Sequence, residues 1–272
     1  MKDTGPLRVA ITCDVESDWG GRAPADDPDT RGLREGLPAC LEVLQDHGVR
    51  GTFFINASVL QTAPEVLGRI SLHGHEVASH SLHHRSLDCL TTEAVREELS
   101  RSRDALEDFF GGCVQGFRAP QGRVPEPWWE LLEEAGYTYD SSIFRTVFPG
   151  RYQHVQAPAI PYRVGKIWEF PVGRLWGTPF PLGLRWVTAL GLVGRALATT
   201  SVGDPVILYM HPFDLVTPDA GETYPLSARL WYKFRASQAR VTLDRLLDAW
   251  QRAGVVFMTL QELASSKLEG HH

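Results

Sequence analysis

The sequence predicts an α/β fold, a distorted or incomplete (β/α) barrel of seven or eight strands. Short apolar runs alternate with longer amphipathic stretches along the whole chain, which is typical of a mostly parallel sheet with helices outside it. Reactive polar side chains follow several of the apolar runs, as they do at the carboxyl end of a barrel. The length of 272 residues suits one barrel, so we expect a single domain over residues 1–266.

The expected strands are short apolar runs bounded by glycine, proline or polar residues. Pro205–Met210 shows this pattern most clearly. The others, in chain order, are Leu7–Thr12, Gly51–Ile55, His75–Ser79, Val114–Arg118, Tyr137–Tyr139, Ile167–Phe170 and Val255–Thr259.

Helices are expected where apolar residues recur three or four positions apart and where a capping residue or a glycine marks an end. Four leucines recur in this way before a natural stop at Gly48, namely Leu33, Leu37, Leu41 and Leu44. Thr91-Thr92-Glu93 opens a helix that runs to about Phe110, because a hydroxyl group caps the first turn and an early acid suits the helix dipole. Further helices are expected at Pro64–His73, Pro127–Ala135, Val241–Ala253 and from Leu260 onward.

Two segments interrupt the alternation, the polar loop Ser17–Thr30 and the irregular stretch Ser142–Lys166. Loops of this length in a compact domain are typical of functional lids and rims. A third segment, Pro179–Ala198, is long and apolar, but Arg185 and Arg195 make it a poor membrane span. We expect it to form an amphipathic helix that closes the barrel. The alternative is a helix on a membrane surface beside a lipid-linked substrate, which would bring the protein into peripheral contact with the membrane.

Composition and charge limit the classes of function. Hydrophobic residues make up 43% of the chain and charged residues 22%, which are ordinary globular values. A net charge of −6 argues against nucleic acid as the main partner. The polar start, Met1–Leu7, lacks the apolar region of a signal peptide, so we expect a cytoplasmic protein. The last residues, 267–272, resemble a cloning remnant with part of a histidine tag.

Reactive side chains gather where the expected strands end. Because the carboxyl ends of parallel strands lie on one face of a barrel, we expect these side chains to converge there. They are Asp14, Glu16, His80, His84, Arg118, Asp140 and His211.

Two of these segments together indicate a metal site. His80 and His84 are four residues apart, and on a helical turn their imidazoles would point the same way and bind one ion. Asp14 and Glu16 place two carboxylates on one side of an extended segment, so that one can complete a His₂-carboxylate site while the other acts as a base. Three protein ligands leave a position open for water, whose pKa a metal lowers from about 15.7 toward about 7. We expect one divalent ion. Zinc suits this ligand set best, although cobalt, nickel or manganese would also fit.

Five segments, in their order and spacing, resemble the motifs of the polysaccharide deacetylase family, also called the NodB homology family or carbohydrate esterase family 4. The first segment is most similar to the Asp-x-Glu branch found in bacterial exopolysaccharide systems. The likeness covers roughly Val9 to Leu260. The segments are Asp14-Val15-Glu16, His80-Ser81-x-x-His84, Arg118-Ala119-Pro120-Gln121-Gly122, Asp140-Ser141-Ser142 and Tyr209-Met210-His211-Pro212.

The resemblance implies a NodB-like barrel and a metal-dependent N-deacetylase, which hydrolyses an N-acetylated amino sugar through a tetrahedral oxyanion to acetate and a free amine. Glu16, His80 and His84 would bind the metal, and Asp14 would be the general base, oriented by Arg118. Most of the family has two adjacent aspartates where Val15 intervenes here. The reverse assignment, with Asp14 as ligand and Glu16 as base, therefore stays open.

The resemblance also implies roles on the leaving-group side. His211 resembles the general acid that protonates the amine, and Asp140 the carboxylate that orients and charges it. The backbone N–H near Gln121 would help to stabilise the oxyanion, which is worth about 3 kcal/mol of barrier. Trp19, just after the two acids, is the best candidate for stacking on a sugar ring.

Two other interpretations of the function stay open. The same fold and metal could serve a deformylase of a lipid-linked aminosugar or a hydrolase of cyclic ureides and imides, and the missing signal peptide motivates both. The Arg31–Gly36 stretch also resembles the deformylase branch slightly. An inactive barrel that binds carbohydrate would be a different class of protein, but it predicts the loss of some site residue, and each expected role has a candidate here. The sequence predicts no oligomeric state.

Overall fold

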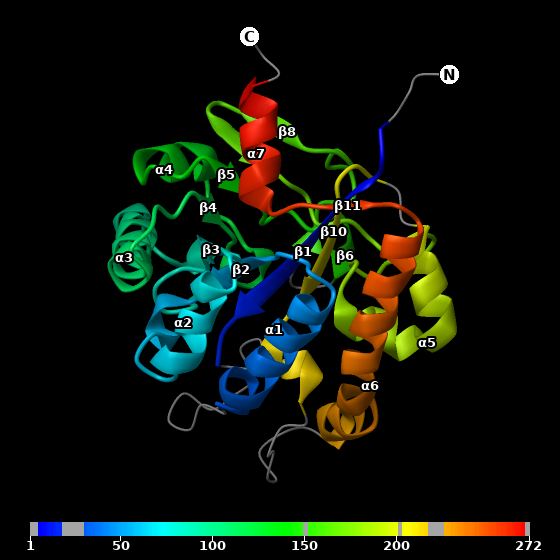
Figure 1. Ribbon diagram of the computed structural model, residues 1–272. Helices are drawn as coiled ribbons and strands as arrows, with labels where there is room; N and C mark the ends of the chain where they lie inside the picture. Colours follow the sequence, from blue (N-terminus) through cyan, green and yellow to red (C-terminus); the bar gives the residue numbers. More distant parts are fainter. Residues whose placement is uncertain (1–4, 18–29, 149–151, 201–202, 217–225, 270–272) are drawn as a thin grey trace.

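The protein folds as a curled sheet with helices packed around it (Figure 1). The structure is a computed structural model that describes residues 5–17, 30–148, 152–200, 203–216 and 226–269. Within these residues the main path of the sheet follows the order β10-β1-β2-β3-β4-β5-β9-β8, and β11 pairs with β1. The expected α/β fold, a distorted barrel, is confirmed.

All neighbours on this path pair in parallel except β8, which runs antiparallel to β9. The strands of the sheet are β1 (Arg8–Val15), β2 (Thr52–Ile55), β3 (Glu76–Ser79), β4 (Gly116–Phe117), β5 (Tyr139–Asp140), β8 (Tyr162–Val164), β9 (Ile167–Glu169), β10 (Val206–Met210) and β11 (Val256–Phe257). Because the parallel strands point the same way, their carboxyl ends share one edge of the sheet.

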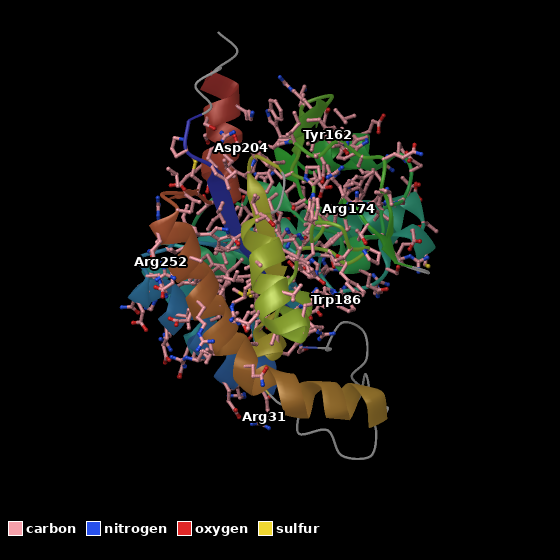
Figure 2. All side chains as sticks on the ribbon, turned by 90° about the vertical axis from the view of Figure 1, so that its right-hand side faces the viewer. Arg31, Tyr162, Arg174, Trp186, Asp204 and Arg252 are labelled. Carbon is pink, nitrogen blue, oxygen red and sulfur yellow. The ribbon has the colours of Figure 1, made fainter. Side chains whose placement is uncertain are left out.

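Most helices lie on the outer face of the sheet, and α5 and α6 run side by side (Figure 2). Short helical turns connect the strands with the helices. The helices are α1 (Leu37–Asp46), α2 (Pro64–Leu72), α3 (Thr92–Phe110), α4 (Trp128–Glu134), α5 (Leu184–Thr199), α6 (Leu226–Arg252) and α7 (Leu260–Glu269). The turns are η1 (Gly32–Gly36), η2 (Ala57–Val59), η3 (Leu87–Cys89), η4 (Pro120–Gly122) and η5 (Pro212–Leu215).

Successive residues of a strand point to opposite faces of the sheet, and this alternation separates two cores. Ile11 and Cys13 of β1 belong to the large core between the sheet and the helices. Ala10 of β1 and Phe54 of β2 belong to the smaller core inside the curl, which Leu260 of α7 helps to fill. α7 covers the end of the curl at which the strands begin (Figure 1). The carboxyl ends of the strands therefore form the other end.

The expected strands and most helices are present, with ends that move by a few residues. Larger differences occur in two places. α6 begins at Leu226, well before the expected Val241. The irregular stretch 142–166 contains β8 and a two-stranded hairpin of β6 (Val147–Phe148) and β7 (Tyr152–Gln153).

The apolar segment expected as a helix forms α5, which Gly191 interrupts with a φ of 59°. The residues before it connect the segment after β5 with β10, because Val172 forms a bridge with Phe144 and Gly183 forms one with Tyr209. None of the described helices is long and apolar enough to cross a membrane.

Candidate metal centre and active site

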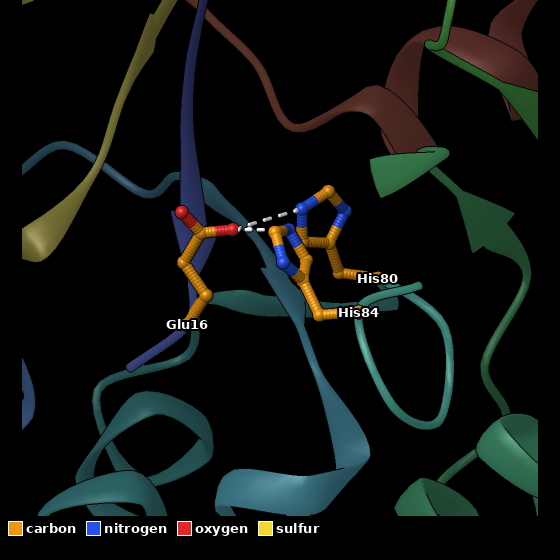
Figure 3. A group of neighbouring side chains, drawn as sticks. All are labelled: Glu16, His80 and His84. Atoms are coloured by element: carbon orange, nitrogen blue, oxygen red, sulfur yellow. Dashed lines mark ion pairs between the residues drawn. The ribbon is translucent and has the colours of Figure 1, made fainter. Parts of the chain in front are cut away.

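Three predicted side chains meet at the carboxyl ends of β1 and β3 (Figure 3). Glu16 follows β1 directly, and His80 follows β3 directly, with His84 four residues later. Their ligand atoms lie within 4.8 Å of one another. The side chains of Glu16 and His80 are each 2% exposed and that of His84 is 6% exposed, so a bound ion would be largely shielded from bulk solvent.

The two histidines converge through a loop and not through the helical turn that their spacing suggested. Residues 80–86 form no helix, and both Ser81 and His84 have positive φ angles, of 65° and 54°. The Ser81 hydroxyl accepts a hydrogen bond from the backbone N–H of His84 at 3.1 Å. The chain therefore turns tightly enough to bring the two rings to a centroid distance of 5.0 Å.

Hydrogen bonding fixes which nitrogen of His80 faces the cluster. Nδ1 of His80 lies 2.7 Å from the backbone carbonyl of Arg118, and a carbonyl can only accept, so Nδ1 carries the proton. Nε2 therefore faces the cluster and lies 3.5 Å from Glu16 Oε2. A metal-ligating histidine commonly has its other ring nitrogen held in this way.

Glu16 has the negative charge and the uncommitted oxygen atom that a metal ligand needs. Burial alone would raise the pKa of Glu16, but the imidazoles of His84 and His80 outweigh it and hold the pKa well below its usual value. Its Oε1 is buried and accepts no hydrogen bond from the part of the chain that the structure describes. One carboxylate and two imidazoles suit a divalent ion such as zinc, so the residues present fit the expected metal.

The second carboxylate, Asp14, lies in a different environment. Oδ1 of Asp14 accepts a hydrogen bond of 2.7 Å from Nη1 of Arg118, and both side chains are buried. Arg118 is held in turn by Ser141, whose carbonyl accepts from Nε at 3.0 Å and whose hydroxyl accepts from Nη2 at 2.8 Å. The guanidinium of Arg118 also lies 4.1 Å from the centroid of the Phe54 ring. The structure thus groups Glu16 with the imidazoles and Asp14 with the arginine.

His211 lies on the far side of Glu16, at the end of β10. Its Nε2 is 3.8 Å from Glu16 Oε1, and its Nδ1 is 3.6 Å from Asp214 Oδ2. Burial lowers the pKa of His211, but the nearby carboxylates of Asp214 and Glu16 outweigh it, so the pKa is raised. Arg185 of α5 donates to Asp214 at 3.1 Å, and the Phe213 ring stacks on His211 with centroids 4.4 Å apart.

The carboxylate beside His211 is therefore Asp214, whereas the family pattern suggested Asp140. Asp140 is opposite Phe117 in the β4–β5 register, and Phe117 belongs to the core on the helix side. Side chains that are opposite each other share a face of the sheet, so Asp140 points toward α4. It accepts hydrogen bonds from Trp128 Nε1 at 3.1 Å and from the Ser142 hydroxyl at 2.6 Å. The same Ser142 hydroxyl accepts from the backbone N–H of Ala119, so Asp140 is linked through Ser142 to the segment that follows Arg118.

Gln121 and Trp19 complete the predicted set. Gln121 is in the turn η4 with a φ of 59°, close in sequence to Arg118 and therefore near the same strand end. Trp19 lies outside the described residues.

Two further side chains were not in the predicted set: Asp214, whose place just after His211-Pro212 suits either a group that supports the site or a turn residue, and Glu98, which the sequence did not single out. Asp214 forms a capping box with His211 at the start of η5, a pattern that the proline at the first helical position could have signalled. Glu98 is buried on the inner face of α3. A lone acid among apolar residues at helical spacing is the signal that could have found it.

Comparison with known proteins identifies the family of the chain. A family model described as polysaccharide deacetylase matches residues 4–139. The chain is 37% identical over 101 residues to the peptidoglycan-N-acetylmuramic acid deacetylase PdaA of Bacillus subtilis, which is 37% of this chain and 38% of that protein. Two other curated relatives are matched over only 37% and 28% of their own length.

Solved structures resemble the whole fold. A structure from Mycobacterium smegmatis has a TM-score of 0.66 at 22% identity and covers 98% of this chain and 91% of that one. A carbohydrate esterase family 4 pseudoenzyme from Bacillus anthracis has a TM-score of 0.59 at 16% identity, covering 97% and 70%. At these identities the likeness shows the fold alone, and an inactive protein shares it. Activity must therefore be argued from the site.

Proposed function

The chain belongs to the polysaccharide deacetylase family, and we propose that it is a metal-dependent N-deacetylase that hydrolyses an N-acetylated amino sugar to acetate and a free amine. One observation carries the proposal. The ligand atoms of Glu16, His80 and His84 lie within 4.8 Å of one another, in contact with His211 on one side and two residues from the Asp14–Arg118 pair. The proposed metal ligands, base and acid thus lie together at the carboxyl ends of the strands.

The metal would be a single divalent ion held by Glu16, His80 and His84. The donor set suits zinc best, and cobalt, nickel or manganese would also fit it. When bound, the ion would polarise the amide carbonyl and lower the pKa of a water molecule in the site.

The side chains of the protein would perform the proton transfers. Asp14 would take the proton of the attacking water, and Arg118 would hold the Asp14 carboxylate in one orientation. The backbone N–H at Gln121 would donate to the carbonyl oxygen as its negative charge develops. His211, kept protonated by Asp214, would give its proton to the leaving nitrogen, so that the C–N bond breaks and a neutral amine departs.

The substrate that we propose is an acetylated amino sugar of a glycan. The named relative acts on N-acetylmuramic acid of peptidoglycan, which favours an acetyl group on a sugar over a formyl group or a cyclic ureide. The spacing of Asp14 and Glu16 supports a place in the Asp-x-Glu branch. We further propose that residues 1–266 form one catalytic domain.

Acetate release from N-acetylglucosamine oligomers and peptidoglycan fragments tests the proposal, with N-formylated sugars and cyclic ureides assayed in parallel. The zinc-loaded protein should release acetate, and a chelator should abolish the release. Asp14→Asn should bind zinc normally but lose about 100- to 10,000-fold in kcat. His80→Ala should lose the zinc as well. Formate or ureide hydrolysis with no acetate would replace the proposed substrate, and a wild-type protein that binds no zinc would overturn the mechanism.

A further inference from the structure

We propose that Glu98 of α3 is a positioning residue for the metal centre, because its carboxylate holds the loop 81–85 in the shape that brings His80 and His84 together. The inference rests on the proposed metal-dependent function. It assigns to that site a residue from a helix that contributes no ligand.

The loop needs external support because of its backbone conformation. Ser81 and His84 have left-handed φ angles of 65° and 54°, which residues other than glycine rarely adopt. Such conformations persist when the surrounding structure holds them. The right-handed alternative at either residue would redirect the following peptide and separate the two imidazoles.

Glu98 supplies that support through both of its oxygens. Oε2 accepts hydrogen bonds from the backbone N–H groups of Leu82 at 2.9 Å and His83 at 3.0 Å. Oε1 lies 3.0 Å from Nδ1 of His83 and accepts from Nε and Nη2 of Arg85 at 2.9 and 2.6 Å. The carboxylate is 1% exposed, whereas the His83 and Arg85 side chains are about half exposed. A buried charge with this set of donors fixes the loop far more firmly than a surface ion pair does.

The rest of the loop is held from the opposite side. Nδ2 of Asn56 donates to the carbonyls of His80 and Ser81 at 3.2 and 3.1 Å. α3 is itself docked at the end of β3, where the hydroxyls of Ser79 and Ser102 are 2.9 Å apart. Ser102 is one helical turn after Glu98, so this contact sets the position of the carboxylate beneath the loop. Asn56 thus holds the carbonyls, and Glu98 holds the N–H groups.

Replacing Glu98 by glutamine tests the inference with little change in volume. The amide keeps one acceptor oxygen but turns an NH₂ group toward N–H donors, which removes several of the hydrogen bonds. The dissociation constant for zinc, measured by competition with a chromogenic chelator, should rise about 10- to 100-fold. The visible spectrum of the cobalt-substituted protein should change as well, since it reports the geometry of the ligands. At saturating zinc, kcat should return to within about twofold of the wild-type value.

Glu107→Gln is the matched control. Glu107 is on the same helix, accepts from the backbone N–H of Val114 at 2.9 Å and pairs with Arg103, but it lies away from the loop. This variant should bind zinc like the wild type. Equal zinc affinity in Glu98→Gln and wild type, or an equal loss in both variants, would overturn the inference while leaving the metal centre intact. A wild-type protein that binds no zinc would overturn the proposed function and this inference together.

Amide hydrogen exchange of the metal-free wild-type protein keeps the inference testable even if Glu98→Gln fails to fold. The amides of Leu82 and His83 should exchange at least about 100-fold more slowly than those of an exposed loop, because both donate to a buried carboxylate. Exchange at the rate of unprotected amides would show that Glu98 does not hold the loop.

Discussion

Asp14 and Glu16 show how the surroundings of a carboxylate decide what it can do. Both point to the same side of β1 and its extension, since they are two residues apart. Glu16 meets two imidazoles, whereas Asp14 meets the buried guanidinium of Arg118. An acid beside imidazoles can share an ion with them, and an acid that accepts a hydrogen bond from a buried arginine is fixed in one orientation. The two proposed roles therefore follow from which neighbouring strand end each side chain faces.

The alkaline limb of the pH–rate profile tests which carboxylate raises the pKa of His211. A general acid must be protonated, so activity is full below its pKa and falls as the pH rises through it. Asp214 and Glu16 raise the pKa of His211. Asp214→Asn removes the largest of these contributions, so the alkaline limb should move to lower pH. At pH 8, kcat should fall by about 10- to 100-fold.

Asp140→Asn distinguishes the two candidate carboxylates in the same assay. Asp140 contacts Trp128 and Ser142 on the helix side of the sheet, so this variant should unfold at a lower temperature but keep the wild-type alkaline limb. The measurement is kcat against pH for both variants at saturating zinc. If the alkaline limb moved in the Asp140→Asn variant and stayed in place in the Asp214→Asn variant, Asp140 would be the carboxylate that raises the pKa of His211.

At the residue scale, the sequence could predict the position of a side chain along the chain but not always its direction. Glu16, His80 and His84 were expected at strand ends and do lie together. Asp140 was expected there too, but a shift of one residue in a strand turns a side chain to the other face of the sheet. That register depends on pairing with Phe117, which no local pattern around Asp140 contains.

At the element scale, the entry of α1 is packed directly against the turn that carries His211. Gly36, in η1, is so close to η5 that a Cβ atom there would overlap the carbonyl group of Pro212. Gly32, one turn earlier, also lies close to Phe213, where a Cβ atom would be in tight contact without overlap. The ring of Phe213 stacks on His211, so the position of η1 affects the position of the His211 imidazole.

Gly36→Ala should therefore destabilise the fold and reduce activity. The added methyl group meets backbone atoms, which cannot rotate away, and overpacking of this kind costs about 1–3 kcal/mol. The free energy of unfolding, measured in urea, and kcat should both fall.

Gly68→Ala is the matched helical control. No heavy atom lies within 4 Å of a Cβ built at Gly68 of α2, so alanine should stabilise the protein by up to about 1 kcal/mol. A stable, fully active Gly36→Ala variant would show that η1 and η5 can separate without cost.

The sequence predicted best the elements that have strong periodicity and clear ends. α3 is one of them, since Thr91 caps it through the N–H of Ala94 and Gly111 ends it in a left-handed conformation. The short strands β6 and β7 were missed, because two residues are too few to show an alternation. α6 was expected to begin at Val241 and begins at Leu226. Leu226, Leu230 and Phe234 recur four residues apart in its early turns, which is a helical spacing that would have signalled the earlier start.

At the scale of the whole molecule, the metal centre joins parts of the sheet that are not neighbours. Glu16 follows β1 and the two histidines follow β3, and β2 lies between these strands. α7 covers the end of the curl at which the strands begin. The candidate ligands lie at the opposite end, where the strands finish. An ion held across β2 would resist any opening that separates β1 from β3.

Zinc should therefore stabilise the entire fold and not only the loop that binds it. The unfolded chain cannot gather Glu16, His80 and His84, so binding to the folded state alone should add about 2.7 kcal/mol to the free energy of unfolding at a zinc concentration 100 times the dissociation constant. Thermal unfolding with zinc and with a chelator measures this difference. His80→Ala should unfold at the same temperature under both conditions, because a site with two ligands holds zinc weakly. A zinc-dependent shift that persists in this variant would place the ion elsewhere in the molecule.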